Sequence, residues 1–137
     1  MLWLASSANN GLVVPLLKLM FYHEISNIYT DGSKSEQGEG AAAVMGDIVR
    51  KVSLPIVASI MTAELHAIRL SLGIINHTPY SNYVVCSDSM SSVQSIDNYT
   101  EDNHILHRLV HQMHESILRG NHITISWVPS HVGICVE

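Results

Sequence analysis

The chain has 137 residues, of which 47% are hydrophobic and 14% charged, and its formal net charge is −5. A single domain accounts for this length, and the apolar composition excludes extended disorder. The acidic balance argues against a protein that holds nucleic acid by lysine and arginine contacts alone, so such a role would need protonated histidines or bound divalent cations. Cys86 and Cys135 set no disulfide framework, which favours a reduced intracellular protein, cytoplasmic or nuclear and not secreted.

The first residues are interpreted as a leader or linker, residues 1–27, that precedes a folded domain, residues 28–137. Their apolar run is interrupted by Pro15 and Lys18 and is shorter than the roughly 20 residues of a membrane span. A secretory signal is not expected, because no basic residue precedes Leu12. We therefore expect no membrane contact.

Three short strands are predicted near the start of the domain. The run IYTDGS at 28–33 is β-branched and aromatic and ends in Asp31, and Gly32 would permit a tight exit that leaves this acid at the rim of a sheet. A polar, glycine-bearing connection leads to a second strand over 41–45, and IVRKVSLP forms a third strand that Pro55 ends. Consecutive strands of this kind predict an antiparallel meander.

The rest of the chain alternates helical and strand patterns. The expected elements are a helix over 61–75, a buried strand over 82–87, a short helix over 90–96, a helix over about 102–119 and a strand over 123–128. Ser59 or Thr62 is expected to cap the first helix, Ser89 the second, and Gly120 to end the third. A strand that leads through a turn to a helix is a crossover unit, which implies parallel neighbours. The sequence therefore predicts an α/β fold with a mixed sheet and helices packed against it.

Three acids occupy comparable places in this arrangement. Asp31 and Asp88 each follow an apolar strand, and Glu64 lies in the first turn of a helix. Because ligand sites gather beyond the carboxyl ends of parallel strands, the three side chains are expected to converge. Each also has a plainer interpretation: Asp31 with Gly32 as a turn, Glu64 as an acid favoured by the helix dipole, and Asp88 as an extra cap.

Convergence of three acids would require protons or cations to offset their mutual repulsion. Carboxylate oxygens are hard ligands that suit Mg²⁺ or Mn²⁺. Two such ions roughly 4 Å apart would activate water on one side of a phosphodiester and stabilise the leaving oxygen on the other. The acids therefore indicate nuclease chemistry.

Four ordered motifs carry a resemblance to a known family. They are IYTDGSK at 28–34, TAELHAI at 62–68, CSDSMSSV at 86–93 and ISWVPSHVGI at 125–134. Together they resemble the type 1 ribonuclease H family, most closely the ribonuclease H domain of non-LTR retrotransposon reverse transcriptases. The resemblance implies a five-stranded mixed sheet with its first three strands antiparallel, and an enzyme that cuts the RNA strand of RNA/DNA hybrids.

The resemblance also implies roles for individual residues. Asp31, Glu64 and Asp88 match the family's ligands of two metal ions, Mg²⁺ or Mn²⁺, and no small-molecule cofactor is expected. His131 matches a loop histidine, where a proton donor to the leaving group or an aid to product release would be useful. Two further residues, Ser33 and Lys34, are the candidates for contact with the RNA strand and its 2′ hydroxyl.

The resemblance further suggests a reverse transcriptase domain as a partner in a longer polyprotein, and it leaves three hypotheses open. The family continues after SHVGI to a fourth acid at the start of a last helix, about four residues beyond Glu137, so the domain is expected to be incomplete at its C-terminus. The first hypothesis is an active hybrid ribonuclease. The second is a non-catalytic retroelement remnant that keeps the fold and binds nucleic acid weakly. The third, a DNA-cutting or DNA-joining enzyme of the same broad fold, fits the order of the motifs less well.

A histidine stripe lies on the predicted helix over 102–119. His104, His107, His111 and His114 recur at steps of three and four residues. We interpret them as a solvated helix face in preference to a zinc site or a contact with backbone phosphate.

Overall fold

The computed structural model describes residues 2–5, 25–36, 38–55, 58–78, 82–100 and 102–129, with the backbone alone for residues 2–5. Its strands are β1 (Leu2–Ala5), β2 (Ile25–Ser35), β3 (Gly38–Met45), β4 (Ile48–Leu54), β5 (Asn82–Ser87) and β6 (His122–Trp127). Its helices are α2 (Ile60–Asn76), α3 (Met90–Asp97) and α4 (His104–Leu118). The predictions for residues 130–137, His131 among them, and for most of residues 1–27 lie outside the described residues.

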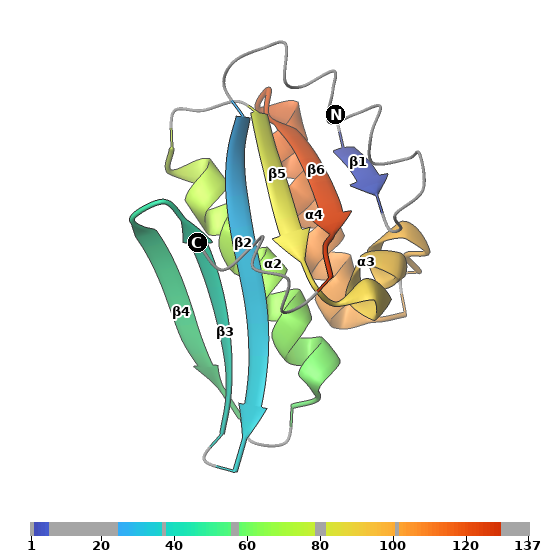
Figure 1. The fold of residues 1–137 in the computed structure, drawn as a ribbon. Helices are drawn as coiled ribbons and strands as arrows, with labels where there is room; N and C mark the ends of the chain where they lie inside the picture. The colour runs from blue at the N-terminus through green and yellow to red at the C-terminus, as the bar shows by residue number, and fades with distance from the viewer. Residues whose placement is uncertain are drawn as a thin grey trace.

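The strands form one mixed sheet in the order β1-β6-β5-β2-β3-β4 (Figure 1). β2, β3 and β4 are antiparallel neighbours, and β2 is parallel to β5, which is parallel to β6. The predicted meander, the crossover and the five-stranded mixed sheet are therefore confirmed. β1 pairs in parallel with β6 and adds a sixth strand at that edge.

The core lies between the sheet and the helices, and α2 and α4 lie behind the sheet in Figure 1. Fully buried side chains from both layers meet there, including Ile28 of β2, Val85 of β5, Ile68 of α2 and Leu109 of α4. Burial of such side chains is the main favourable term in folding. None of the helices in the described ranges combines the length and the apolar character needed to cross a lipid bilayer.

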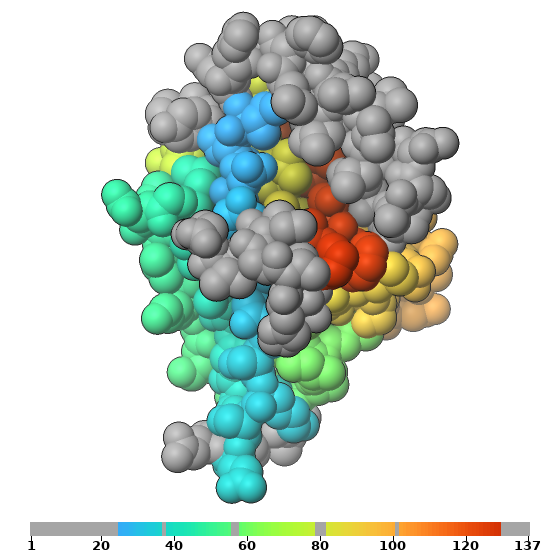
Figure 2. Space-filling view, in the orientation of Figure 1, coloured from blue at the N-terminus to red at the C-terminus, as the bar shows by residue number. Residues whose placement is uncertain are grey.

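The first hairpin differs from the sequence prediction. β2 continues to Ser35, so Asp31 and Gly32 lie inside the strand, where they pair with Ala42 and Ala41 of β3. The expectation of a strand that ends in an acidic turn was therefore wrong. The strand persists because β3 pairs with it along this whole length, and the far end of β2 projects from the body of the molecule (Figure 2).

The helix ends follow the predicted signals, with one shift. The Ser59 and Ser89 side chains accept hydrogen bonds from the backbone of the first turns of α2 and α3, as expected of N-caps. The N-cap of α4 is Asn103, whose Oδ1 accepts from the backbone N–H of Ile105 and of Leu106, so this helix begins two residues later than predicted. Gly120 follows its end with a φ of 101°, as a glycine C-terminal to a helix commonly does.

Candidate metal centre

Two of the three acids lie where neighbouring parallel strands separate. The pairing of β2 with β5 ends at Thr30 and Ser87, so Asp31 and Asp88 are the next residues on the two strands. Thr30 holds this junction through a hydrogen bond from its Oγ1 to the carbonyl oxygen of Cys86, at 2.8 Å. The end of the parallel ladder therefore places the two acids side by side.

Glu64 reaches the same place from α2 because that helix lies very close to β2. A Cβ added at Gly32 would lie 2.5 Å from the backbone nitrogen of Glu64 and 2.6 Å from the carbonyl carbon of Ala63. Only glycine permits this approach, and the Gly32 N–H donates a hydrogen bond to the Glu64 carboxylate. Glu64 is the fifth residue of α2 and thus lies in its second turn, one turn later than predicted.

The geometry of the three carboxylates suits a cation. One oxygen from each of Asp31, Glu64 and Asp88 lies within 4.8 Å of the other two. Glu64 is buried, with 6% of its surface exposed, whereas the two aspartates reach solvent. Burial, followed by the charges of Asp88 and Asp31, raises the pKa of Glu64 to about 7. Its Oε2 atom is buried and has no hydrogen-bond partner among the described residues. A divalent ion would both neutralise this cluster and coordinate the buried oxygen, so the residues fit a metal.

The turn after β5 fixes the backbone at Asp88. Ser87 Oγ accepts a hydrogen bond from the backbone N–H of Ser89 at 3.1 Å, and Ser89 in turn caps α3. From the neighbouring strand, Trp127 Nε1 donates to the carbonyl oxygen of Asp88 at 3.2 Å. Ser89 therefore serves as the N-cap of α3, as predicted.

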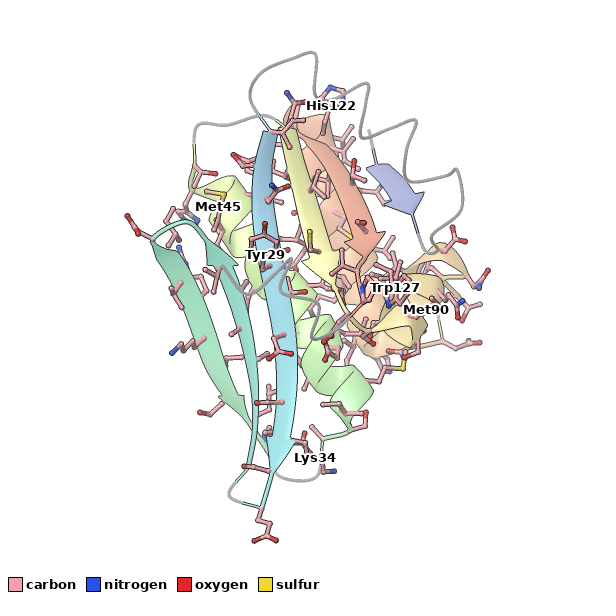
Figure 3. All side chains as sticks on the ribbon, in the orientation of Figure 1. Tyr29, Lys34, Met45, Met90, His122 and Trp127 are labelled. Carbon is pink, nitrogen blue, oxygen red and sulfur yellow. The ribbon has the colours of Figure 1, made fainter. Side chains whose placement is uncertain are left out.

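Ser33 and Lys34 lie on opposite faces of β2. Ser33 lines an open groove of about 320 Å³ together with Asp31 and with Lys51 of β4. Lys34 lies toward the far end of the strand (Figure 3), and its Nζ is 3.2 Å from Oε1 of the buried Glu39 carboxylate on β3. Lys51 and Glu39 were not predicted as site residues. The strand register places both, because Glu39 pairs directly with Lys34, and Lys51 pairs with Ala42, the partner of Asp31.

The histidine stripe has local partners on and beside α4. Its four side chains are exposed, as predicted for a solvated face. The Tyr99 hydroxyl lies 2.6 Å from Nδ1 of His107, and His111 Nε2 lies 3.2 Å from Oε1 of Glu115. In the described part of the chain, the acidic triad is the one group of three or more metal-ligating side chains that comes within ligand distance, and the stripe is not part of it.

A mixed sheet with two carboxylates just beyond the last pair of the β2–β5 ladder, and a third that reaches them from α2, defines a candidate centre for divalent cations. The RNase H family model matches residues 23–137, so the chain belongs to the RNase H family. No curated protein sequence gives a significant match. Among solved structures, RNase H1 from the halophilic archaeon Halobacterium salinarum NRC-1 matches with a TM-score of 0.59 and 17% identity, over 77% of this chain and 86% of that one. This likeness confirms the ribonuclease H-like fold.

Proposed function

We propose that this protein is a metal-dependent endoribonuclease that cleaves the RNA strand of RNA/DNA hybrids. The observation that carries the proposal is the meeting of three carboxylates within 4.8 Å, one of them buried with an unpartnered oxygen, in a chain of the RNase H family. An acidic cluster of this kind stabilises a fold poorly unless a cation is bound, so its presence favours a functional site.

Asp31, Glu64 and Asp88 would hold the metal, Mg²⁺ or Mn²⁺, with two ions proposed for the working site. Divalent ions in such a site supply an activated water and charge stabilisation at the leaving oxygen. The raised pKa of Glu64, about 7, means that this side chain is close to half protonated at neutral pH. Metal binding must displace that proton, and metal affinity should therefore rise with pH through this range.

The substrate contacts are proposed along β2 and the groove beside it. Ser33 and Lys51 line the groove that contains Asp31, and they offer a hydroxyl and an ammonium group to the sugar and phosphate of the RNA strand. Lys34, whose side chain is about half exposed although it is paired with Glu39, is proposed as a further contact. His131 is proposed, from its motif alone, to assist proton transfer to the leaving group or release of the product.

The wider setting of the protein is proposed from the same motifs. The residues of the four sequence motifs, at 28–34, 62–68, 86–93 and 125–134, favour a retrotransposon origin. Residues 28–137 would then act inside the cell beside a reverse transcriptase domain of the same polyprotein. The alternative is a non-catalytic remnant that binds nucleic acid weakly.

The test is cleavage of a labelled RNA/DNA hybrid by the purified chain in Mg²⁺ or Mn²⁺. Asp88→Asn should reduce the rate of hybrid cleavage by at least about 100-fold. Even replacement of a residue that only hydrogen-bonds to a metal ligand reduces metal affinity or activity about 10–100-fold. Asp97→Asn is the matched control, since Asp97 is an exposed acid at the end of α3 outside the cluster. Equal cleavage by Asp88→Asn and the parent would overturn the proposed site.

Two other outcomes separate the alternatives. Hybrid binding without metal-dependent cleavage by the parent would favour the remnant. Cleavage of duplex DNA with no cleavage of hybrid would instead contradict the proposed substrate.

A further inference from the structure

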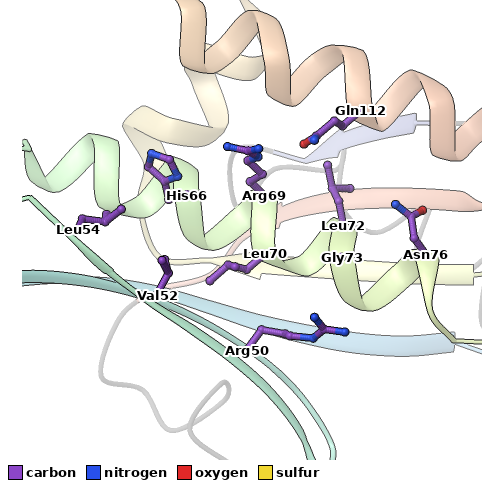
Figure 4. Close-up of a pocket in the computed structure, with 10 residues that line it drawn as sticks. All are labelled: Arg50, Val52, Leu54, His66, Arg69, Leu70, Leu72, Gly73, Asn76 and Gln112. Atoms are coloured by element: carbon purple, nitrogen blue, oxygen red, sulfur yellow. The ribbon is translucent and has the colours of Figure 1, made fainter.

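A second groove, of about 410 Å³, lies on the helix side of the sheet and contains none of the three carboxylates (Figure 4). It shares one lining residue, Val52, with the groove beside Asp31. α2 packs mainly under β2 and β3, and β4 extends beyond it as the edge strand. The groove follows the side of α2 beneath this overhang and reaches α4 at Gln112. The helix layer is therefore unfilled below β4 in the described part of the chain.

The walls of the groove are apolar. Val52 and Leu54 line it from β4, and Leu70 lines it from α2. Val52 is 39% exposed, although its side chain faces this interior side of the sheet edge. Uncovered aliphatic side chains that line a concave surface favour contact with another apolar group.

The rim of the groove is cationic. Arg50 of β4 and Arg69 of α2 line it, and Arg69 also lines an adjoining groove with Arg108 of α4. No carboxylate side chain is among the described residues that line either groove. The sequence has four arginines, and the fourth, Arg119, donates a hydrogen bond to Asn76 at one end of the larger groove. Two of the four arginines of a chain with a net charge of −5 thus line this groove, and a third, Arg108, lines the adjoining one.

Gly73 contributes to the same surface from the interior of α2. A Cβ added there would meet no atom of the described residues within 4 Å, and its φ is not among the positive values found at Gly38, Gly46 and Gly120. Glycine destabilises a helix interior relative to alanine, and no contact in the described part of the chain requires glycine at this position. A bare backbone in a groove does, however, allow a ligand to approach the helix closely.

We propose that this groove docks an acidic amphipathic helix of a partner protein. Such a helix would complete the helix layer under β4, with its apolar stripe on Val52, Leu54 and Leu70 and its closest approach at Gly73. Its flanking carboxylates would pair with Arg50 and Arg69. A phosphodiester backbone matches the arginines but brings no aliphatic groups to cover the apolar walls, so the groove favours a peptide over nucleic acid.

The test is a titration of the full chain with a synthetic helical peptide of about 18 residues, five helical turns, that carries a leucine stripe flanked by glutamates. Binding is followed by fluorescence anisotropy and by amide chemical shifts. Shifts should cluster on β4 and α2, and replacement of the peptide's glutamates by glutamine should weaken binding at least tenfold. Equal affinity of the two peptides, or shifts away from the groove, would overturn the proposal.

Variants of the protein sharpen this result. Arg50→Glu and Arg69→Glu should each weaken peptide binding about tenfold, whereas Lys51→Glu, a charge change on the opposite face of β4, should not alter it. Gly73→Ala should raise the melting temperature of the protein and yet weaken peptide binding. A purely structural role for Gly73 would not give this combination. Hybrid cleavage by Arg50→Glu should stay at the parent rate. Displacement of the peptide from the groove by a single-stranded oligonucleotide would show a nucleic-acid site and refute the proposal.

Discussion

Replacement of Gly32 by alanine should damage both the fold and the metal centre. The new Cβ would lie 2.5 Å from the backbone nitrogen of Glu64, whereas ordinary contact begins at 3.4 Å. The helix α2 must therefore move away from β2 by about 1 Å, since backbone atoms cannot rotate aside. Overpacking of this kind typically lowers the free energy of unfolding by about 1–3 kcal/mol. We expect about 3 kcal/mol, because the two shortest contacts, with the nitrogen of Glu64 and the carbonyl carbon of Ala63, are both with backbone atoms. A displacement of about 1 Å at a catalytic group can cost on the order of 100-fold in rate.

Urea unfolding and hybrid cleavage measure these two effects. Gly73→Ala is the matched control, because the same substitution meets none of the described atoms within 4 Å and should stabilise α2 by about 0.5–1 kcal/mol. The two alanine variants should thus move the unfolding midpoint in opposite directions. If Gly32→Ala unfolds at the parent's urea concentration, α2 does not approach β2 as closely as described and the reasoning fails.

Three further predictions concern single groups. The pKa of Glu64, raised from 4.5 to about 7, means that between these pH values the metal-free folded state holds a proton that the unfolded state has released. The contribution of this group to stability is therefore fully present below pH 4.5 and is lost as pH rises through 7. After solvent screening we expect a loss of roughly 1–2 kcal/mol, which thermal unfolding from pH 4 to pH 8 would measure and which Glu64→Gln should abolish. Asn103→Ala removes the acceptor for two N–H groups of α4 and should cost about 1 kcal/mol in urea unfolding; no change would argue against the cap. Tyr83→Phe deletes the hydroxyl that lies 2.6 Å from Thr78 Oγ1, and a cost of about 1 kcal/mol is expected by the same measurement, with an unchanged midpoint as the contrary result.

The order of the elements could be predicted because it depends on local patterns. The apolar run at 82–87 gave β5 with its observed bounds, and Ser89 was recognised as a cap because its side chain acts within one helical turn. The length of β2 could not be predicted in this way. An Asp-Gly pair favours a turn locally, and only pairing with β3 keeps the strand extended through Asp31 and Gly32.

The candidate site was predicted in part. The positions predicted for Asp31, Glu64 and Asp88 indicated that their side chains converge. In the structure, one oxygen of each lies within 4.8 Å of the other two. The need for glycine at position 32 could not be predicted. It arises because Ala63 and Glu64 of α2, about thirty positions later in the sequence, pack against the backbone there. The groove lined by Arg50 and Arg69 could not be predicted for the same reason, because these two residues come together only after α2 has packed against the sheet.

The point where β2 and β5 part has a consequence for the dimensions of the metal centre. Hydrogen-bonded strands lie about 4.8 Å apart, and the ions of a two-metal site lie about 4 Å apart. Because Asp31 and Asp88 are the first residues beyond the last pair of the ladder, the backbone sets their separation. Apolar residues of β5 can then change without altering this distance, whereas a slip of one residue in strand register would turn Asp88 to the other face of the sheet.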